Sequence, residues 1–401
     1  MLALLAVGGY VLLRDNGTQI IAPEGAPAGN DASTREDSAA RLLGRLQSGL
    51  AEGDRPDVVA LAAPDSKGAA RRMGDIFDNA RQLGLEDLSF RYVDENEGHV
   101  GAGEWVADVQ VSWRIAGFDK VASQMEVPIA FARTSQGAAF VSVDDAADNS
   151  APLWLLDKVA VERGRRSLVM VADESRVRHY ASLARRAAAD VKRVLPRWRG
   201  RLVVEVPGSE EDLERIVGAE NDAYQSIAAV TSTVDGSLDP SSPAHVLVNP
   251  TVFRRLSGDG AQIVISHEAT HVATSAATSS IPMWLLEGFA DYVALAHVDL
   301  PVSTTASQIL AEVRKSGVPS HLPTAREFDP ANKALGTSYE AAWLACRLIG
   351  MRYGEQRLIE LYDRVERGLS VNAGFRRVLD TDRRTFVSQW QDYLRDLASE
   401  A

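Results

Sequence analysis

Two histidines four residues apart, with a glutamate directly after the first, are the residues of this sequence best suited to chemistry. They are His267, Glu268 and His271, in the stretch HEATH. In a helix, residues four apart lie only about 40° apart on one face, so both imidazoles can bind one cation. Glu268 lies one step around the helix and can reach a water on the metal without binding the metal itself. The pattern therefore predicts a metal site with a general base beside it.

A second segment, WLLEGFADY, supplies the missing ligand. Fifteen residues lie between His271 and Glu287, enough for a helix end, a turn and a second helix that returns past the first. Glu287 would be the third ligand, and three protein ligands with one open position are typical of catalytic zinc. Asp291, one turn further on, can accept the other ring N–H of a ligating histidine. Gly288 allows close contact between helices.

These two segments together resemble the gluzincin zinc metallopeptidases, in particular the peptidase-MA-like domains. The resemblance covers about residues 165 to 396 and implies Zn²⁺ as the cofactor and a peptide or protein as the substrate. It implies that His267, His271 and Glu287 bind zinc and that Glu268 is the general base. Two further features are expected from the resemblance. One is an oxyanion-stabilising tyrosine, for which Tyr339 is the candidate, and the other is an edge strand that binds substrate, for which we expect residues 244–249 with Val246, Val248 and Asn249.

The hydropathy patterns predict an α+β chain with two folded parts. Helical spacing at residues 38–53 and 66–84 is followed by four alternating segments that predict an antiparallel sheet. This order of elements is similar to NTF2-like modules, which we expect over residues 38–147. A connector at 148–164 then leads to the peptidase-like domain at 165–401. That domain is predicted to be mostly helical from residue 262 onward, with a small sheet before it and a loop or flap at 221–244.

The N-terminal residues and the composition bear on location. Residues 1–13, MLALLAVGGYVLL, predict a membrane anchor or a signal remnant, and the Gly- and Pro-containing residues 14–37 predict a flexible linker. The globular part is then expected outside the cytoplasm, tethered to the cell membrane, or secreted if the N-terminus is cleaved. The formal net charge of −12 argues against a nucleic-acid partner. The single cysteine, Cys346, excludes a disulfide within the chain.

Two functions are consistent with these observations. The first is a zinc-dependent peptidase that hydrolyses peptide bonds outside the cytoplasm, with Glu268 as the general base. The second is a membrane-tethered binding or scaffold protein with a relic, non-catalytic metal site. An intact Glu268 favours the peptidase, because a structural metal site has no use for a base. Neither the substrate nor the choice between endo- and exopeptidase can be read from the residues. The histidines at 99, 179, 297 and 321 are expected to be structural or solvated.

Overall fold

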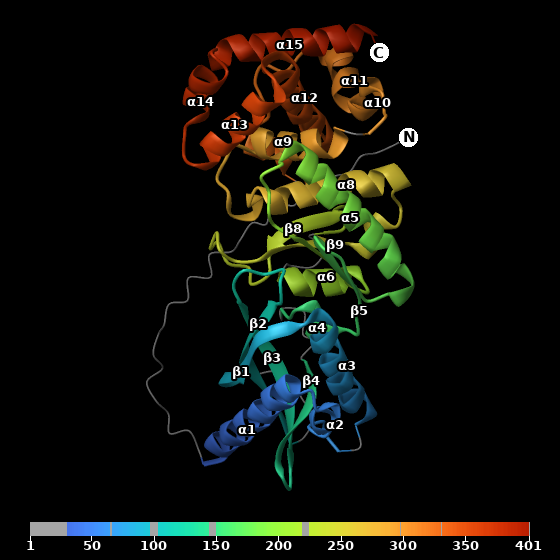
Figure 1. Cartoon of the computed structure of the whole chain (residues 1–401), viewed down its shortest axis with the longest axis vertical. Coiled ribbons are helices and arrows are strands. Elements are labelled where there is room, and N and C mark those ends of the chain that lie inside the picture. Colours follow the sequence, from blue (N-terminus) through green and yellow to red (C-terminus); the bar gives the residue numbers. More distant parts are fainter. Residues whose placement is uncertain are drawn as a thin grey trace.

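The computed structural model describes residues 30–401 apart from 65, 97–102, 144–149, 219–223, 297, 330 and 401. The predicted anchor at 1–13 and most of the predicted linker lie outside the described residues. Among the described residues, no helix combines the length and the apolar character that a membrane span requires. The chain is a mixed α/β protein built along one long axis, with an N-terminal module, a second sheet and a helical region in succession (Figure 1).

The N-terminal module contains the two predicted helices, a further short helix between them that was not predicted, and then the predicted four-stranded antiparallel meander. Ser66 caps the third helix by accepting a hydrogen bond from the amide of Ala69, and Gly84 ends it in the left-handed conformation. The NTF2-like identity of this module stays a prediction. The elements, in chain order, are α1 Asn30–Glu52, α2 Arg55–Val59, α3 Lys67–Leu83, β1 Leu85–Asn96, β2 Glu104–Ile115, β3 Ser123–Thr134 and β4 Gly137–Val143, and the strand order is β1-β2-β3-β4.

The predicted linker is wrong over residues 30–37, where α1 already runs. Arg35 explains part of this extension, because its guanidinium forms an ion pair with Glu95 of β1 at 3.1 Å and lies over the ring of Trp105 in β2. Arg35 thus ties the second turn of α1 to the sheet. The segment is polar in composition, but these side-chain contacts make it part of the folded module.

A five-stranded mixed sheet forms the middle of the molecule. Its strand order is β5-β6-β7-β9-β8, with β6, β7 and β9 parallel to one another and an antiparallel strand at each edge. All residues of β6 and β7 are buried, as expected for parallel strands covered on both faces. The elements of this part are α4 Leu153–Leu156, β5 Ala160–Arg163, β6 Ser167–Val171, η1 Glu174–Arg176, α5 Val177–Val194, β7 Leu202–Val206, α6 Glu210–Val217, β8 Ala229–Thr233 and β9 Ala244–Val248.

Three sequence-based expectations change here. The connector predicted at 148–164 contains β5, which is an edge strand of this sheet rather than a link between domains. The loop predicted at 221–244 contains β8, the other edge strand. The edge strand predicted at 244–249 is wrong, because β9 pairs with β7 on one side and with β8 on the other.

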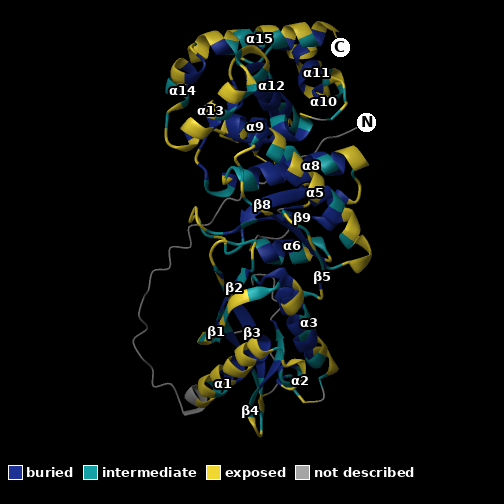
Figure 2. Cartoon of the chain, viewed as in Figure 1, coloured by how far each residue is buried: buried dark blue, intermediate teal, exposed yellow. Residues whose placement is uncertain are grey.

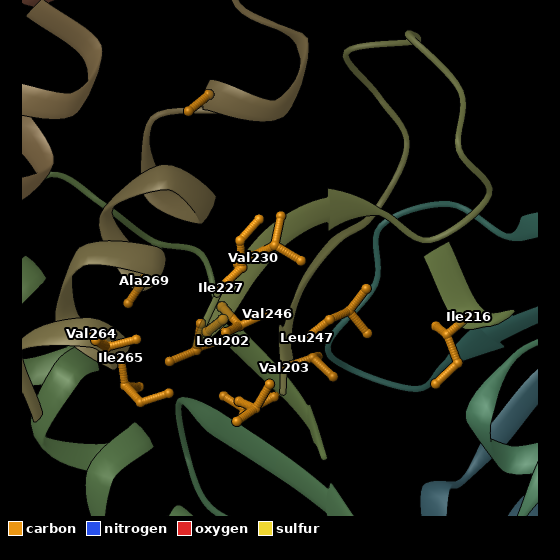
Figure 3. Close-up of a cluster of buried hydrophobic side chains, with 14 of the residues drawn as sticks. Leu202, Val203, Ile216, Ile227, Val230, Val246, Leu247, Val264, Ile265 and Ala269 are labelled. Atoms are coloured by element: carbon orange, nitrogen blue, oxygen red, sulfur yellow. The ribbon is translucent and has the colours of Figure 1, made fainter. Parts of the chain in front are cut away.

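One face of this sheet supports the helix that carries both histidines. This helix is α8, Gly258–Ala273, and it packs together with α5 on the sheet (Figure 1). Figure 3 shows Val264, Ile265 and Ala269 of α8 turned toward the strands. The opposite face is covered by α6 and by the N-terminal module, so the sheet lies between the metal-site helix and that module (Figure 1).

The remainder of the chain is helical, as predicted from residue 262 onward. Helix α9 packs on α8, and α12 packs along α9. Figure 2 shows that burial is concentrated in α8, α9 and the sheet, whereas α1, α14 and α15 carry much of the exposed surface. The elements are α7 Pro250–Phe253 before α8, and then η2 Ala276–Thr278, α9 Met283–Leu295, α10 Val302–Thr305, α11 Ser307–Ser316, η3 Ala325–Phe328, α12 Leu335–Tyr353, α13 Glu355–Glu366, α14 Val371–Val378 and α15 Arg383–Glu400.

Candidate metal centre

Helix α8 is buried along most of its length, including the polar residues of its second half, which are Ser266, His267, Glu268, Thr270 and His271. The hydroxyl of Ser257 caps its first turn by accepting a hydrogen bond from the amide of Gly260. His267 is 0% exposed, Glu268 1% and His271 5%. Buried polar side chains need partners, and buried charges need pairing or a metal. The burial of three such groups on one helix therefore requires a matching set of groups opposite them.

Helix α9 supplies those groups. After η2 the chain returns along α8, and Glu287 and Asp291 of α9 are both buried and face His267. The close approach of α9 to α12 depends on Gly288, because a Cβ atom there would lie 2.4 Å from the carbonyl oxygen of Ala342. Gly288 thus permits the predicted helix contact, on the side of α12.

Three ligand atoms converge on one point. Nε2 of His267 lies 2.9 Å from Nε2 of His271 and 3.1 Å from Oε2 of Glu287. Nε2 of His271 lies 3.3 Å from the same Glu287 oxygen. A tetrahedral zinc ion with bonds of about 2.1 Å places its ligand atoms roughly 3.4 Å apart. Small outward movements of these side chains would fit such an ion, and the three residues form a group that could hold a metal.

The hydrogen bonding of His267 also fits a cation. Its Nδ1 lies 2.7 Å from Oδ1 of Asp291, and because a carboxylate only accepts hydrogen bonds, this nitrogen carries the proton. A neutral ring then has its lone pair on Nε2, directed at a second imidazole nitrogen and at the Glu287 carboxylate. Three lone-pair atoms around one point require a positive charge between them, supplied by a proton or by a metal ion.

The pKa shifts show how strongly these groups favour a positive charge. Burial opposes protonation of His267, but the carboxylates of Asp291 and Glu287 outweigh it and raise the pKa of His267 well above its ordinary value. Burial likewise opposes ionisation of Glu287, but His271 and His267 lower the pKa of Glu287 to about 2. Glu287 is therefore an anionic ligand at neutral pH, as metal binding requires.

Glu268 is held by a contact from the sheet that the sequence analysis does not include. The hydroxyl of Thr231 in β8 lies 2.8 Å from Oε2 of Glu268 and 3.0 Å from its backbone carbonyl oxygen. Burial raises the pKa of Glu268, while His271, His267 and the Thr231 hydrogen bond act in the opposite direction. A raised pKa brings a carboxylate closer to the range in which it can accept and return a proton near neutral pH.

Tyr339 lies at the same site. Its ring centroid is 6.2 Å from that of His267 and 5.1 Å from that of Phe328, which it meets edge-on. Tyr339 is in the second turn of α12 and is 5% exposed. The structure thus brings together all six residues expected at the centre, which are His267, Glu268, His271, Glu287, Asp291 and Tyr339.

The expected substrate-binding residues lie elsewhere. Val246, Val248 and Asn249 are each 0% exposed. Val246 and Val248 belong to an interior strand, and the Asn249 side chain caps α7 and donates to the carbonyl oxygen of Tyr224. Their assignment to substrate binding is wrong, because neither edge of β9 is free. The strand beside the metal centre whose outer edge carries no partner among the described strands is β8.

The sequence analysis did not identify two polar residues, Thr231 and His245, that the sheet places in contact with residues far away in the chain. Thr231 lies in the stretch IAAVTSTV, whose β-branched residues are a strand signal that the later Gly and Pro of the same segment obscured. His245 lies on the opposite face of β9 from Val246. Its two ring nitrogens lie 2.6 Å from Glu205 of β7 and 3.0 Å from Asp119, which comes from the β2–β3 turn of the N-terminal module. No local pattern indicates a contact between residues so far apart in the chain.

The chain was compared with protein-family models, curated proteins and solved structures. None of the three comparisons gives a match. The resemblance to gluzincins therefore stays a prediction that rests on the residues of the two motif segments and on the group of side chains described above.

Proposed function

We propose that this protein is a zinc-dependent peptidase. The observation that carries the proposal is the group formed by His267, His271 and Glu287, with the buried carboxylate of Glu268 on the same helix. This is a three-ligand arrangement with a base next to it, which suits hydrolysis rather than a purely structural ion. Action outside the cytoplasm remains part of the proposal and rests on residues 1–13, outside the described part of the chain.

The chemistry divides between the ion and the protein. When bound, zinc supplies a Lewis acid that polarises a carbonyl and lowers the pKa of water to about 7. Glu268 accepts the proton of the attacking water and passes it to the leaving amine. Asp291 holds the His267 ring in the tautomer whose Nε2 faces the centre. Tyr339, whose ring lies beside that of His267, is the candidate donor of a hydrogen bond to the developing oxyanion.

In this proposal an extended substrate would lie along the outer edge of β8, and because all five residues of β8 are buried and η2 contacts the strand, η2 would have to move to admit it. At the two ends of the β8–β9 pairing, the Ala228 carbonyl accepts a hydrogen bond from the Asn249 amide and the Val234 amide donates one to the Pro243 carbonyl. The backbone groups of Ala229, Thr231 and Thr233 therefore face the outer edge. Addition of a strand to a free sheet edge is a common way to bind a peptide backbone. Thr231 then joins the substrate-binding edge to the base, which would place the scissile bond near Glu268.

Replacement of the base tests this function in the full-length protein. We expect Glu268→Gln to retain zinc and to lose at least about a hundredfold of the hydrolysis of a quenched fluorescent peptide mixture. Glu312→Gln, at an exposed position of α11, is the matched control and should behave like the parent. Cleavage by Glu268→Gln at the parental rate would disprove the general-base role. A parent protein that binds zinc and cleaves no peptide would instead support the scaffold function.

A further inference from the structure

A large apolar pocket opens beside the proposed catalytic centre. It has a volume of about 760 Å³ and lies among the loop before α9, the segment that includes η3, and the first residues of α14 and α15. We call it the apolar pocket. Its apolar lining comes from Ile281, Met283, Trp284, Leu322, Phe328 and Val371.

Two connections join the apolar pocket to the metal centre. Met283 lines the pocket and lies four residues before Glu287, so the two side chains are on the same face of α9, one turn apart. Phe328 lines the pocket from η3, and its ring meets that of Tyr339, which in turn lies beside His267. The buried side chains of Met283 and Phe328 are therefore the part of the pocket wall nearest to the metal centre, and a ligand in the pocket would lie next to that centre.

The rim of the pocket carries an excess of positive charge. Arg326 and Arg383 line it and are exposed, and neither guanidinium forms a hydrogen bond or an ion pair with any residue that the structure describes. Asp329 is the single acidic residue of the lining. Two unpaired arginines on a chain with a net charge of −12 favour a carboxylate on the ligand.

Resting on the proposed peptidase function, we propose that the apolar pocket binds a bulky apolar side chain of the polypeptide substrate near the scissile bond, and that Arg326 and Arg383 select an acidic residue next to it. The substrate class is then polypeptides with a large apolar residue flanked by Glu or Asp. A cavity of this size accommodates an aromatic side chain together with part of the adjoining backbone.

Binding to the full-length, zinc-loaded Glu268→Gln variant tests this inference without requiring turnover. The probes are fluorescein-labelled nonapeptides with a central Phe, flanked by Glu on both sides, in a background of Ala, Ser and Thr. Companion peptides replace Phe by Ser or both Glu by Gln. We expect the Phe peptide to bind at least about tenfold more tightly than the Ser peptide, because the Phe ring is transferred from water into the apolar pocket. The flanking Glu residues should add about threefold to fivefold at low salt.

Two matched pairs of variants locate the effect. Ala325→Trp places a large ring at an exposed position of the pocket lining and should abolish the preference for Phe, whereas Ala311→Trp, exposed on α11, should retain it. The double change Arg326→Gln with Arg383→Gln should remove the preference for Glu and keep that for Phe. Arg178→Gln with Lys315→Gln removes the same charge from exposed positions outside the pocket and should change neither preference.

The outcomes separate this inference from the proposed function. Equal binding of the Phe and Ser peptides, or an unchanged preference in Ala325→Trp, would overturn the pocket assignment even if the parent protein cleaves peptides. A preference for the Phe peptide that Ala325→Trp abolishes would support the pocket assignment even if the parent protein cleaves no peptide. In that case only the peptidase proposal would fail. A fatty acid that binds in the pocket and is displaced by neither the Phe peptide nor the Ser peptide would also overturn the pocket assignment.

Discussion

The hydroxyl of Thr231 on β8 donates a hydrogen bond to the carboxylate of Glu268 on α8, across a distance of 2.8 Å. This contact joins the edge strand of the sheet to the proposed base, and both residues are buried. A carboxylate with a fixed partner samples fewer rotamers than a free one, so Thr231 is a positioning residue for the proposed reaction. The proposed base keeps this hydrogen bond only while α8 and β8 keep their relative positions.

Thr231→Val should therefore lower kcat by about tenfold and leave KM nearly unchanged, because it removes the hydroxyl while keeping the shape of the side chain. Thr231→Ser retains the hydroxyl and should recover most of the rate. Steady-state kinetics on a fluorescent peptide, with the zinc content of each variant measured in parallel, checks both expectations. Equal kcat values for the Val and Ser variants at full zinc content would show that the hydrogen bond does not position the base.

Gly288 should tolerate no side chain. In Gly288→Ala the new Cβ atom would lie 2.4 Å from the carbonyl oxygen of Ala342 and 3.0 Å from Sγ of Cys346, so α9 would have to move away from α12. We expect a loss of about 2–3 kcal/mol in the free energy of unfolding, measured by urea denaturation. The control is Gly68→Ala in α3, where a Cβ meets no atom within 4 Å and the helix should become slightly more stable. Equal stability of the two variants would contradict this account of the helix contact.

Asp291 should control metal affinity without binding the metal. It accepts a hydrogen bond from Nδ1 of His267, and loss of such a partner typically weakens metal binding about 10- to 100-fold. We expect this loss in Asp291→Ala and a smaller one in Asp291→Asn, whose amide oxygen still accepts a hydrogen bond. Competition for zinc with a chromophoric chelator gives the affinities, with Asp259→Ala at an exposed position of α8 as control. Parental affinity in Asp291→Ala would remove this role.

The sequence was most informative where a contact is local in the chain. The spacing of His267, His271 and Glu287 predicted a shared site because two helices joined by a short turn leave few other arrangements. Helical and strand periodicities likewise predicted the two longer helices and the four strands of the N-terminal module, in the right order.

Strand order was not predictable in the same way. β8 (AVTST) and β9 (AHVLV) are both short, and only their pairing decides which of them is the edge. The composition of either strand is compatible with both positions, so residues 244–249 were misassigned. Contacts of long range, such as those of Thr231 with Glu268 and of His245 with Asp119, follow from that pairing and leave no local signal.

The stability of the protein should depend on pH through His245, which joins the central sheet to the N-terminal module. Burial opposes its charge, but Asp119 and Glu205 outweigh burial and raise the pKa of His245 to about 10. Since an unfolded histidine has a pKa of about 6.5, the stabilisation is complete below that pH and is lost as the pH rises toward about 10. The difference in unfolding free energy between the parent and His245→Gln should therefore decrease as the pH rises from about 6.5 to about 10. Urea denaturation at several pH values in this range measures it. His179→Gln, at an exposed position of α5, should show no such trend. A difference between parent and His245→Gln that stays constant over this range would mean that His245 does not carry the charge that holds the two parts together.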